Sequence, residues 1–386
     1  MVISRFCKRF IRHPKSSLWG LICYIFKVNK RKIVFCNFAG NGYSDNPKYI
    51  AEEIIKEKLD SQIVWLVRKH YDDIPECIKQ VKLPTLSSAY ELSTAKVIVI
   101  NTKNVLPFFK KKSQYLIQTW HSTYGPKYVE KDAMDTLTAN YIKDSIENSE
   151  DTDLFISPCK LQTEEFRHAF WCNCEILPSG IPRNDIYFNY DSSTINEIKK
   201  RINLPCDAKI LIYAPTFRDD KSIDIYSMLN FAKIQLTLEK RFGGNWFILV
   251  RLHPGIRYEV KFGFQFNDRI INVSDYDDIQ ELLLISNILI TDYSSIMFDF
   301  YLLKKPVFLF TPDINSSHIR GIRPSFYDFP FDHCITEEDL LSSIESFKES
   351  DYFFRINKFD KQFQSYDDGN ASERVVRRIN QILTTS

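Results

Sequence analysis

Short apolar runs alternate with longer segments of helical periodicity along most of this chain. Near-continuous apolar strands that alternate with helices are typical of parallel sheets covered on both faces. The first series of runs comprises residues 33–36, 63–67, 97–100, 115–117 and 154–156, and the second comprises residues 210–214, 246–251, 270–273, 288–290 and 307–310. The pattern therefore predicts an α/β protein with two doubly wound domains that face a cleft.

Length supports this division, because 386 residues are more than one hydrophobic core usually serves. The polar segment at residues 189–194 begins a helical connector between the two series. We therefore predict an N-terminal domain at residues 33–195 and a C-terminal domain at residues 196–386. Residues 1–32 differ in composition and form a separate segment.

That first segment places basic residues on both sides of an aromatic-rich apolar stretch at residues 18–26. The stretch is shorter than the ~20 apolar residues that span a membrane, and no small-residue cleavage site of a secretory signal follows it. Such a pattern is typical of a helix lying in the interface of an anionic cytoplasmic leaflet. The alternative is a structural helix packed on the main body. We expect the first, which places the protein peripherally on the cytoplasmic face of the cell membrane.

Charge and cysteine content narrow the function classes. A formal net charge of +2 gives no overall nucleic-acid signature. The nine cysteines are odd in number and scattered, which is typical of reduced thiols in a cytoplasmic protein. Cys172 and Cys174 lack a second ligand pair at zinc-site spacing, and neither a dinucleotide fingerprint nor a Walker loop is present. We expect no metal and no cofactor.

A phosphate-site pattern stands at residues 288–300, where an apolar strand ends in Thr291 to Ser295 and a predicted amphipathic helix follows. Ser294 and Ser295 would stand beside the unpaired N–H groups of the first helical turn, where the macrodipole favours an anion. The alternative is that these serines only cap the helix, which serine does well.

Polar residues that are capable of chemistry follow other strands as well. His121 follows the run at residues 115–117, and an imidazole at the mouth of a cleft can accept the proton of an attacking hydroxyl. The alternative for a lone histidine is a surface or structural role. Arg218, Arg251 and His253 follow strands of the second series and could clamp a diphosphate without a metal. Each arginine alone could equally be a solvated charge or an ion-pair partner.

Seven motifs run in order along nearly all of the chain after its first segment. They are residues 118–121 (QTWH), 180–185 (GIPRND), 213–219 (YAPTFRD), 251–254 (RLHP), 289–299 (LITDYSSIMFD), 320–321 (RG) and 368–376 (DGNASERVV). The set resembles the CDP-glycerol glycerophosphotransferase family. Members of that family are teichoic-acid primases and polymerases that transfer glycerol phosphate or ribitol phosphate from a CDP-linked donor to a membrane-linked acceptor.

The resemblance implies a GT-B-like pair of Rossmann-like domains, with the nucleotide in the C-terminal domain and the acceptor approaching from the N-terminal side. It implies that His121 is the general base, while His253 stabilises phosphate or assists as an acid. The residues that it implies for the donor diphosphate are Thr216, Arg218, Arg251, Ser294 and Ser295. The implied reaction is attack by an acceptor hydroxyl on the polyol-bearing phosphorus, with CMP leaving.

Other motif residues carry weaker assignments. Asp292 and Asp299 are expected to be structural, because carboxylates aimed at a diphosphate would repel it unless a metal intervened. Arg320 and Gly321 are assigned either to the nucleotide side or to structure, since the spacing around them departs from the family pattern. Ser122 stands where the family usually has glycine, which bears on the identity of the acceptor.

Three functions from different classes are consistent with these features. The predicted one is a transferase that uses a CDP-linked polyol donor and a lipid-linked or glycan acceptor, in teichoic-acid-like or capsular polysaccharide synthesis. The alternatives are a GT-B glycosyltransferase that uses a nucleotide sugar and a non-catalytic nucleotide-binding scaffold. Release of CMP, release of a nucleoside diphosphate and binding without turnover distinguish the three. Glycerol and ribitol stay alternative polyols, and the oligomeric state is left open.

Overall fold

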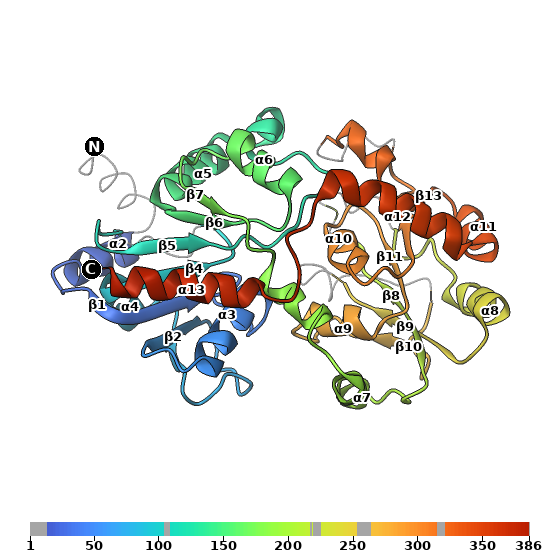
Figure 1. Cartoon of the computed structure of the whole chain (residues 1–386), viewed down its shortest axis with the longest axis horizontal. Coiled ribbons are helices and arrows are strands. Elements are labelled where there is room, and N and C mark those ends of the chain that lie inside the picture. Colours follow the sequence, from blue (N-terminus) through green and yellow to red (C-terminus); the bar gives the residue numbers. More distant parts are fainter. Residues whose placement is uncertain are drawn as a thin grey trace. The chain divides into compact units, whose positions relative to one another are not determined.

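The computed structural model describes residues 14–103, 109–216, 218, 225–252, 264–314 and 321–385. The chain divides into two compact units, each built on one parallel sheet (Figure 1). The first unit comprises Met1–His121, Leu137–Asp185 and Ser365–Ser386, and the second comprises Ser122–Thr136 and Ile186–Gln364.

The first unit contains a seven-stranded parallel sheet with the order β3-β2-β1-β4-β5-β6-β7. Its strands are β1 (Asn29–Cys36), β2 (Gln62–Val67), β3 (Lys79–Lys82), β4 (Ala95–Ile100), β5 (Tyr115–Gln118), β6 (Leu154–Ile156) and β7 (Glu175–Leu177). Its α-helices are α2 (Pro14–Cys23), α3 (Asp45–Lys56), α4 (Leu86–Thr94), α5 (Ala139–Asp151), α6 (Lys160–Ala169) and α13 (Ala371–Thr384).

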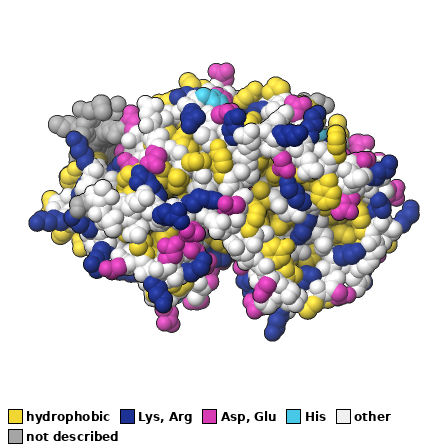
Figure 2. Space-filling view, viewed as in Figure 1, with side chains coloured by type: hydrophobic (Ala, Val, Ile, Leu, Met, Phe, Trp, Pro, Cys, Tyr) yellow, Lys and Arg dark blue, Asp and Glu magenta, His cyan; other side chains and the backbone are white. Residues whose placement is uncertain are grey.

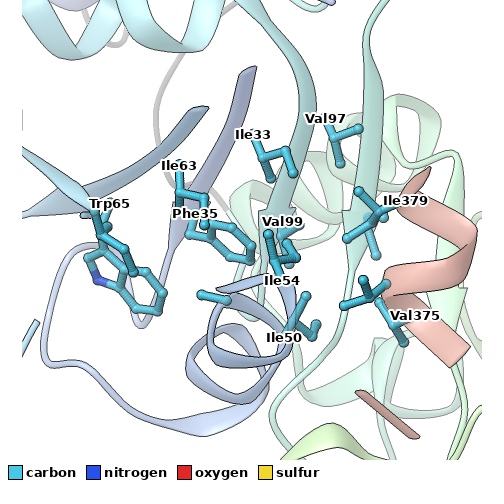
Figure 3. Close-up of a cluster of buried hydrophobic side chains, with 14 of the residues drawn as sticks. Ile33, Phe35, Ile50, Ile54, Ile63, Trp65, Val97, Val99, Val375 and Ile379 are labelled. Carbon is cyan, nitrogen blue, oxygen red and sulfur yellow. The ribbon is translucent and has the colours of Figure 1, made fainter. Parts of the chain in front are cut away.

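The core of this unit joins the sheet to α3 and to the C-terminal helix α13. Figure 3 shows Val375 and Ile379 of α13 directed at the side chains of β4, including Val97. Both α13 residues are completely buried. The N-terminus of α13 is capped from a distance, since the Asp185 carboxylate accepts hydrogen bonds from the backbone N–H groups of Ala371 at 2.9 Å and Ser372 at 2.7 Å. Two of the sequence motifs, residues 180–185 and 368–376, therefore meet at this cap.

The second unit contains a six-stranded parallel sheet with the order β10-β9-β8-β11-β12-β13. Its strands are β8 (Lys209–Tyr213), β9 (Trp246–Val250), β10 (Ile270–Asn272), β11 (Ile288–Thr291), β12 (Val307–Phe310) and β13 (Asp332–Cys334). Its α-helices are α7 (Ser192–Arg201), α8 (Phe231–Phe242), α9 (Ile279–Ile285), α10 (Ile296–Tyr301), α11 (Glu337–Ser346) and α12 (Glu349–Phe363). Short 3-10 segments are η1 (Glu130–Thr136), η2 (Pro182–Tyr187) and η3 (Pro324–Asp328).

The predicted fold class is confirmed, and every predicted strand is present. The sequence pattern missed β3, β7 and β13, which are short and lie at or next to a sheet edge. The helix after Ser295 was predicted to be amphipathic, but α10 is short and buried from Met297 to Tyr301. A helix enclosed on all sides has no polar face to produce an amphipathic pattern.

The observed units differ from the predicted division at residues 195 and 196. The second unit already includes Ile186, and it also takes in Ser122–Thr136. Ser365–Ser386 returns to the first unit, because α13 buries its apolar face against that unit's sheet and α3. A boundary drawn from sequence order alone does not reveal such a return.

The surface carries charges of both signs without a dominant patch on the face shown in Figure 2. None of the helices in the described part of the chain is long and apolar enough to cross a membrane.

We expect the substitution Ile379→Ala to lower the free energy of unfolding by about 2–5 kcal/mol, since it leaves a cavity in a closely packed core. Urea denaturation followed by circular dichroism measures the change. Asn380→Ala is the matched control, because Asn380 lies exposed on the same helix. Equal effects of the two substitutions would contradict the assignment of α13 to the core.

Candidate functional site

Parallel strands bring their carboxyl ends to one edge of a sheet, and polar residues gather at that edge in the first unit. Asn37 follows β1, Asn101 follows β4, and His121 follows β5 after Thr119 and Trp120. These strands are neighbours in the order β1-β4-β5. The sheet therefore places the predicted general base beside two buried asparagines.

The imidazole of His121 is held by one ring nitrogen. Its Nδ1 lies 2.8 Å from the backbone oxygen of Asn101. A carbonyl oxygen only accepts hydrogen bonds, so the neutral ring carries its proton on Nδ1 and presents an unprotonated Nε2. Because the side chain is exposed, water reaches the ring.

Groups around the ring lower the pKa of His121 below its ordinary value of 6.5. The main cause is desolvation, because the surrounding protein atoms displace water that would stabilise the charged imidazolium. Exposure of the side chain limits this effect. The shift keeps the imidazole neutral at pH 7, which is the form that accepts a proton.

The backbone around this histidine is unusual. Trp120 has φ +55°, Phe38 has φ +38° and Ala39 has φ +54°, in the left-handed region that residues other than glycine seldom adopt. Strained residues of this kind cluster at functional sites, where the surrounding structure holds them in place. The rings of Trp120 and Phe38 lie 4.6 Å and 6.0 Å from the imidazole, measured between centroids.

In the second unit, the carboxylate of Asp292 organises the carboxyl ends of β8 and β11. It accepts hydrogen bonds from the backbone N–H of Thr216 at 3.0 Å and from the Thr216 hydroxyl at 3.0 Å. Arg218 forms an ion pair with the same carboxylate, with Nη1 and Oδ2 2.7 Å apart. Asp292 is buried, and it holds two of the predicted donor-binding residues.

Arg218 is also paired with a second carboxylate, that of Asp313, through Nε at 2.6 Å. Burial alone would lower the pKa of the guanidinium, but the two carboxylates outweigh burial and raise it. Thr216 and Arg218 are thus bound to aspartates in this structure. A donor diphosphate would have to compete with those carboxylates, and the phosphate role of both residues stays a prediction.

Arg251 is engaged too, since its guanidinium donates to the backbone oxygens of Val273 and Tyr276. It thereby ties the end of β9 to the loop after β10. His253 and Arg320, which were predicted to act at phosphate and on the nucleotide side, lie outside the described residues. Their convergence with Arg251 therefore stays a prediction.

Ser294 and Ser295 are partly exposed at the junction of β11 and α10. Ser295 occupies the N-cap position of α10 but makes no side-chain capping hydrogen bond. Ser294 accepts one long bond from the backbone N–H of Ile296, at 3.4 Å. Helix capping thus explains little of this serine pair. Gly125 lies close by, since a Cβ added there would be 3.8 Å from Cβ of Ser295.

Asp299 is a buried carboxylate that is hydrogen-bonded within the second unit. Its carboxylate accepts hydrogen bonds from the Thr123 hydroxyl at 2.6 Å and from Nε2 of Gln280 at 3.1 Å. The segment after Thr123 also pairs with residues 321 and 322. Lys127 and Ile322 form an antiparallel β-bridge, and the backbone N–H of Tyr128 donates to the backbone oxygen of Gly321. A Cβ on Gly321 would lie 3.0 Å from the Tyr128 ring, which favours the structural assignment of this glycine.

Sequence reasoning missed several residues that surround His121. The missed residues are Asn37, Asp45, Asn46, Asn101 and Arg183, and all of them are buried. A usable signal was present for Asn37 and Asn101, since each directly follows a predicted apolar strand. Within the described ranges, no group of three or more His, Cys, Asp or Glu side chains is arranged to hold a metal ion.

Two Rossmann-like parallel sheets with polar strand ends define the GT-B-like class of α/β proteins. The family model described as CDP-Glycerol:Poly(glycerophosphate) glycerophosphotransferase matches residues 21–381. The chain belongs to this family, as its sequence motifs predicted.

Known relatives agree with this membership. The chain is 34% identical over 380 residues to the teichoic acid poly(glycerol phosphate) polymerase of Staphylococcus epidermidis, covering 94% of this chain and 52% of the polymerase. It is 31% identical over 393 residues to the teichoic acid glycerol-phosphate transferase of Staphylococcus aureus, covering 98% of this chain and 100% of the transferase. The chain thus spans about half the length of the first relative and all of the second.

Solved structures give the same result. A structure of the wall teichoic acid polymerase TagF has a TM-score of 0.84 at 33% identity and covers 99% of this chain and 97% of the polymerase chain. A TagF variant soaked with CDPG has a TM-score of 0.85 at 31% identity, with coverage of 99% and 98%.

We expect His121 to titrate with a pKa below 6.5 and to carry its neutral-state proton on Nδ1. The imidazole is then neutral at pH 7 and becomes protonated only as the pH falls through the lowered pKa. Nuclear magnetic resonance of the ring Cε1–H and ring nitrogens measures both properties, and loss of the signals in His121→Gln assigns them. A midpoint above 6.5, or a proton on Nε2, would contradict the described geometry.

Proposed function

We propose that the protein transfers a polyol phosphate from a CDP-linked donor to a hydroxyl of a lipid-linked or glycan acceptor and releases CMP. Family membership supports this reaction, as do the names of the relatives, which refer to the transfer or polymerisation of glycerol phosphate or ribitol phosphate. The TagF structure soaked with CDPG supports a CDP-linked donor.

The observation that carries the proposal is the geometry of His121. Its Nδ1–H is committed to the backbone oxygen of Asn101, the side chain is exposed, and the lowered pKa keeps Nε2 free of a proton at pH 7. These are the properties of a general base poised for a hydroxyl group. A histidine with a merely structural role would not need an open, unprotonated nitrogen.

The reaction balances without a cofactor. Nε2 of His121 takes the proton of the acceptor hydroxyl, and the oxygen attacks the phosphorus that bears the polyol. A new P–O bond forms as the bond between that phosphorus and the bridging oxygen of the diphosphate breaks. CMP leaves with the bonding electrons, and its phosphate charge must be neutralised as it departs.

Residues of the second unit supply that neutralisation in our proposal. Ser294 and Ser295 donate hydroxyl hydrogen bonds to the diphosphate, and Arg251 and His253 contribute positive charge. Thr216 and Arg218 border the same strand ends and reach the phosphates when their bonds to Asp292 rearrange. Asp292 and Asp299 remain structural anchors.

The test is to incubate the protein with CDP-glycerol, CDP-ribitol and a UDP-sugar, together with a lipid-linked acceptor, and to identify the released nucleotide. We expect CMP from a CDP-polyol and a loss of about 10²–10⁴-fold in its rate in His121→Gln. His168→Gln is the control, because His168 is exposed on α6 of the same unit. Release of a nucleoside diphosphate, or full activity of His121→Gln, would contradict the proposal.

We also propose that α2 and the residues after it rest on an anionic membrane surface. One face of α2 packs on α4, with Ser17 and Cys23 buried, so the structural alternative holds for that face. Most other large apolar side chains of this region are exposed, and the exposed group continues onto α4. It comprises Leu18, Leu21, Ile22, Tyr24, Ile25, Phe26, Leu86 and Tyr90. Exposed Lys27 and Lys30 follow the apolar group and complement anionic lipid.

Liposome flotation with phosphatidylglycerol vesicles tests this surface. We expect the double substitution Ile22→Glu and Ile25→Glu to reduce the bound fraction at least about tenfold, since each apolar side chain removed from water contributes about 1.5–3 kcal/mol. Leu236→Glu is the matched control, because Leu236 is an exposed apolar residue on α8 of the other unit. Equal flotation of the parent and the double variant would overturn the membrane contact.

A further inference from the structure

The loop before His121 is held by the first turn of α3. Nδ2 of Asn46 donates to the backbone oxygens of Thr119 at 3.4 Å and Trp120 at 3.2 Å. Asn46 is completely buried, so these bonds are shielded from water. They hold Trp120, which has φ +55° and directly precedes His121. They therefore fix the direction in which the chain at His121 leaves the strand.

A second connection reaches the imidazole itself through Asn101. Nδ2 of Asn101 donates to Oδ2 of Asp45 at 2.8 Å and to Oδ1 of Asn37 at 2.7 Å. Oδ1 of Asn101 accepts from the backbone N–H of Phe38 at 2.8 Å. The side chain of Asn101 is thus bound on both of its polar atoms. Its backbone oxygen, which orients Nδ1 of His121, has little freedom to move.

Arg183 joins the two connections. Its Nη1 lies 2.8 Å from Oδ1 of Asp45, and its backbone N–H donates to Oδ1 of Asn46 at 3.2 Å. The side chains of Arg183 and Asp45 are 5% and 6% exposed, so the ion pair is shielded from solvent. Removing one partner of such a pair leaves a buried charge uncompensated, which costs far more than loss of a surface pair.

We propose that Asp45, Asn46 and Arg183 are positioning residues for His121, which fix the orientation of its ring and hold its proton on Nδ1. This inference rests on the proposed role of His121 as the general base. The motif at residues 180–185 then has two functions, since Asp185 caps α13 while Arg183 supports the base.

The charges near the imidazole make this inference measurable. The carboxylate of Asp45 favours the protonated ring, whereas the cations of Arg183 and Lys103 disfavour it. The Asn101 contact comes from a backbone oxygen, which no substitution removes. Neutralising Asp45 should therefore lower the pKa of His121, and neutralising Arg183 should raise it. Shifts of opposite sign would show that both charges act on the imidazole, and the tautomer of the ring in the same variants would report whether these residues also fix its orientation.

The experiment measures CMP release from CDP-glycerol in the presence of the lipid-linked acceptor, as a function of pH, for Asp45→Asn, Arg183→Gln and Asn46→Ser. We expect the acid limb to move to lower pH in Asp45→Asn and to higher pH in Arg183→Gln. In all three variants kcat should fall by about 10²-fold while KM for CDP-glycerol is unchanged, because a misplaced catalytic group impairs the chemical step. Arg183→Lys keeps the positive charge but loses the planar guanidinium group. Compared with Arg183→Gln, it should therefore bring the pH profile closer to that of the parent than it brings kcat.

Glu91→Gln is the matched control for general loss of stability. Glu91 forms a buried ion pair with Lys32 in the same unit, and the two side chains also bind Lys79 and Thr94, which lie away from the His121 network described above. This variant should lose stability while its pH profile stays in place. An equal shift in Glu91→Gln and Asp45→Asn would overturn the positioning role.

A resonance titration of His121 separates this inference from the proposed function, because it requires no turnover. An altered tautomer of His121 in Asn46→Ser, together with opposite pKa shifts in Asp45→Asn and Arg183→Gln, would support the positioning role. This holds even if CMP release survives in His121→Gln, a result that would refute only the general base. If CMP release depends on His121 but its titration and tautomer are the same in all three variants, the positioning role is wrong. Asn46→Ser leaves the ion pair between Asp45 and Arg183 intact. If Asp45→Asn and Arg183→Gln do not fold, the tautomer of His121 in Asn46→Ser still tests the positioning role.

Discussion

Burial of a carboxylate is the physical constraint on which both strand-end regions of this protein depend. An ionised carboxylate out of water is costly unless donors surround it. Asp45 binds Arg183 and Asn101, Asp292 binds Thr216 and Arg218, and Asp299 binds Thr123 and Gln280. Each aspartate thereby joins segments that are far apart in sequence, and the loops that carry the candidate site have few alternative arrangements.

This constraint changes how the motifs are understood. Several residues of the sequence motifs are aspartates, or are donors that bind a buried aspartate. Residues 180–185 illustrate this, because Asp185 caps a helix that begins at Ala371 while Arg183 neutralises Asp45. His121 differs from these residues, since its side chain is exposed and, among the described residues, only Nδ1 of its ring is bound to the protein. An exposed imidazole held in a fixed orientation is what the proposed role of His121 as general base requires.

The sequence predicted the central strands because strands buried on both faces are continuously apolar. It missed β3, whose sequence KQVK is mostly polar, because an edge strand has fewer neighbours to pack against. It predicted that His121 would stand at a strand end, but not its tautomer, which depends on a carbonyl from another strand. It did not predict the ion pair between Arg218 and Asp313, because pairing between residues 95 positions apart leaves no local pattern in the sequence.

The return of α13 to the first unit has a consequence for synthesis on the ribosome. Residues Ile186–Gln364 are translated before the helix that completes the first core. At about 5–20 residues per second, this interval is on the order of ten seconds or more. At the end of that time the second unit has its whole chain, whereas the face of β4 that holds Val97 and Val99 still lacks its final cover. The earlier-translated unit is therefore the last to close, and its unfinished surface is what a nascent-chain chaperone would meet.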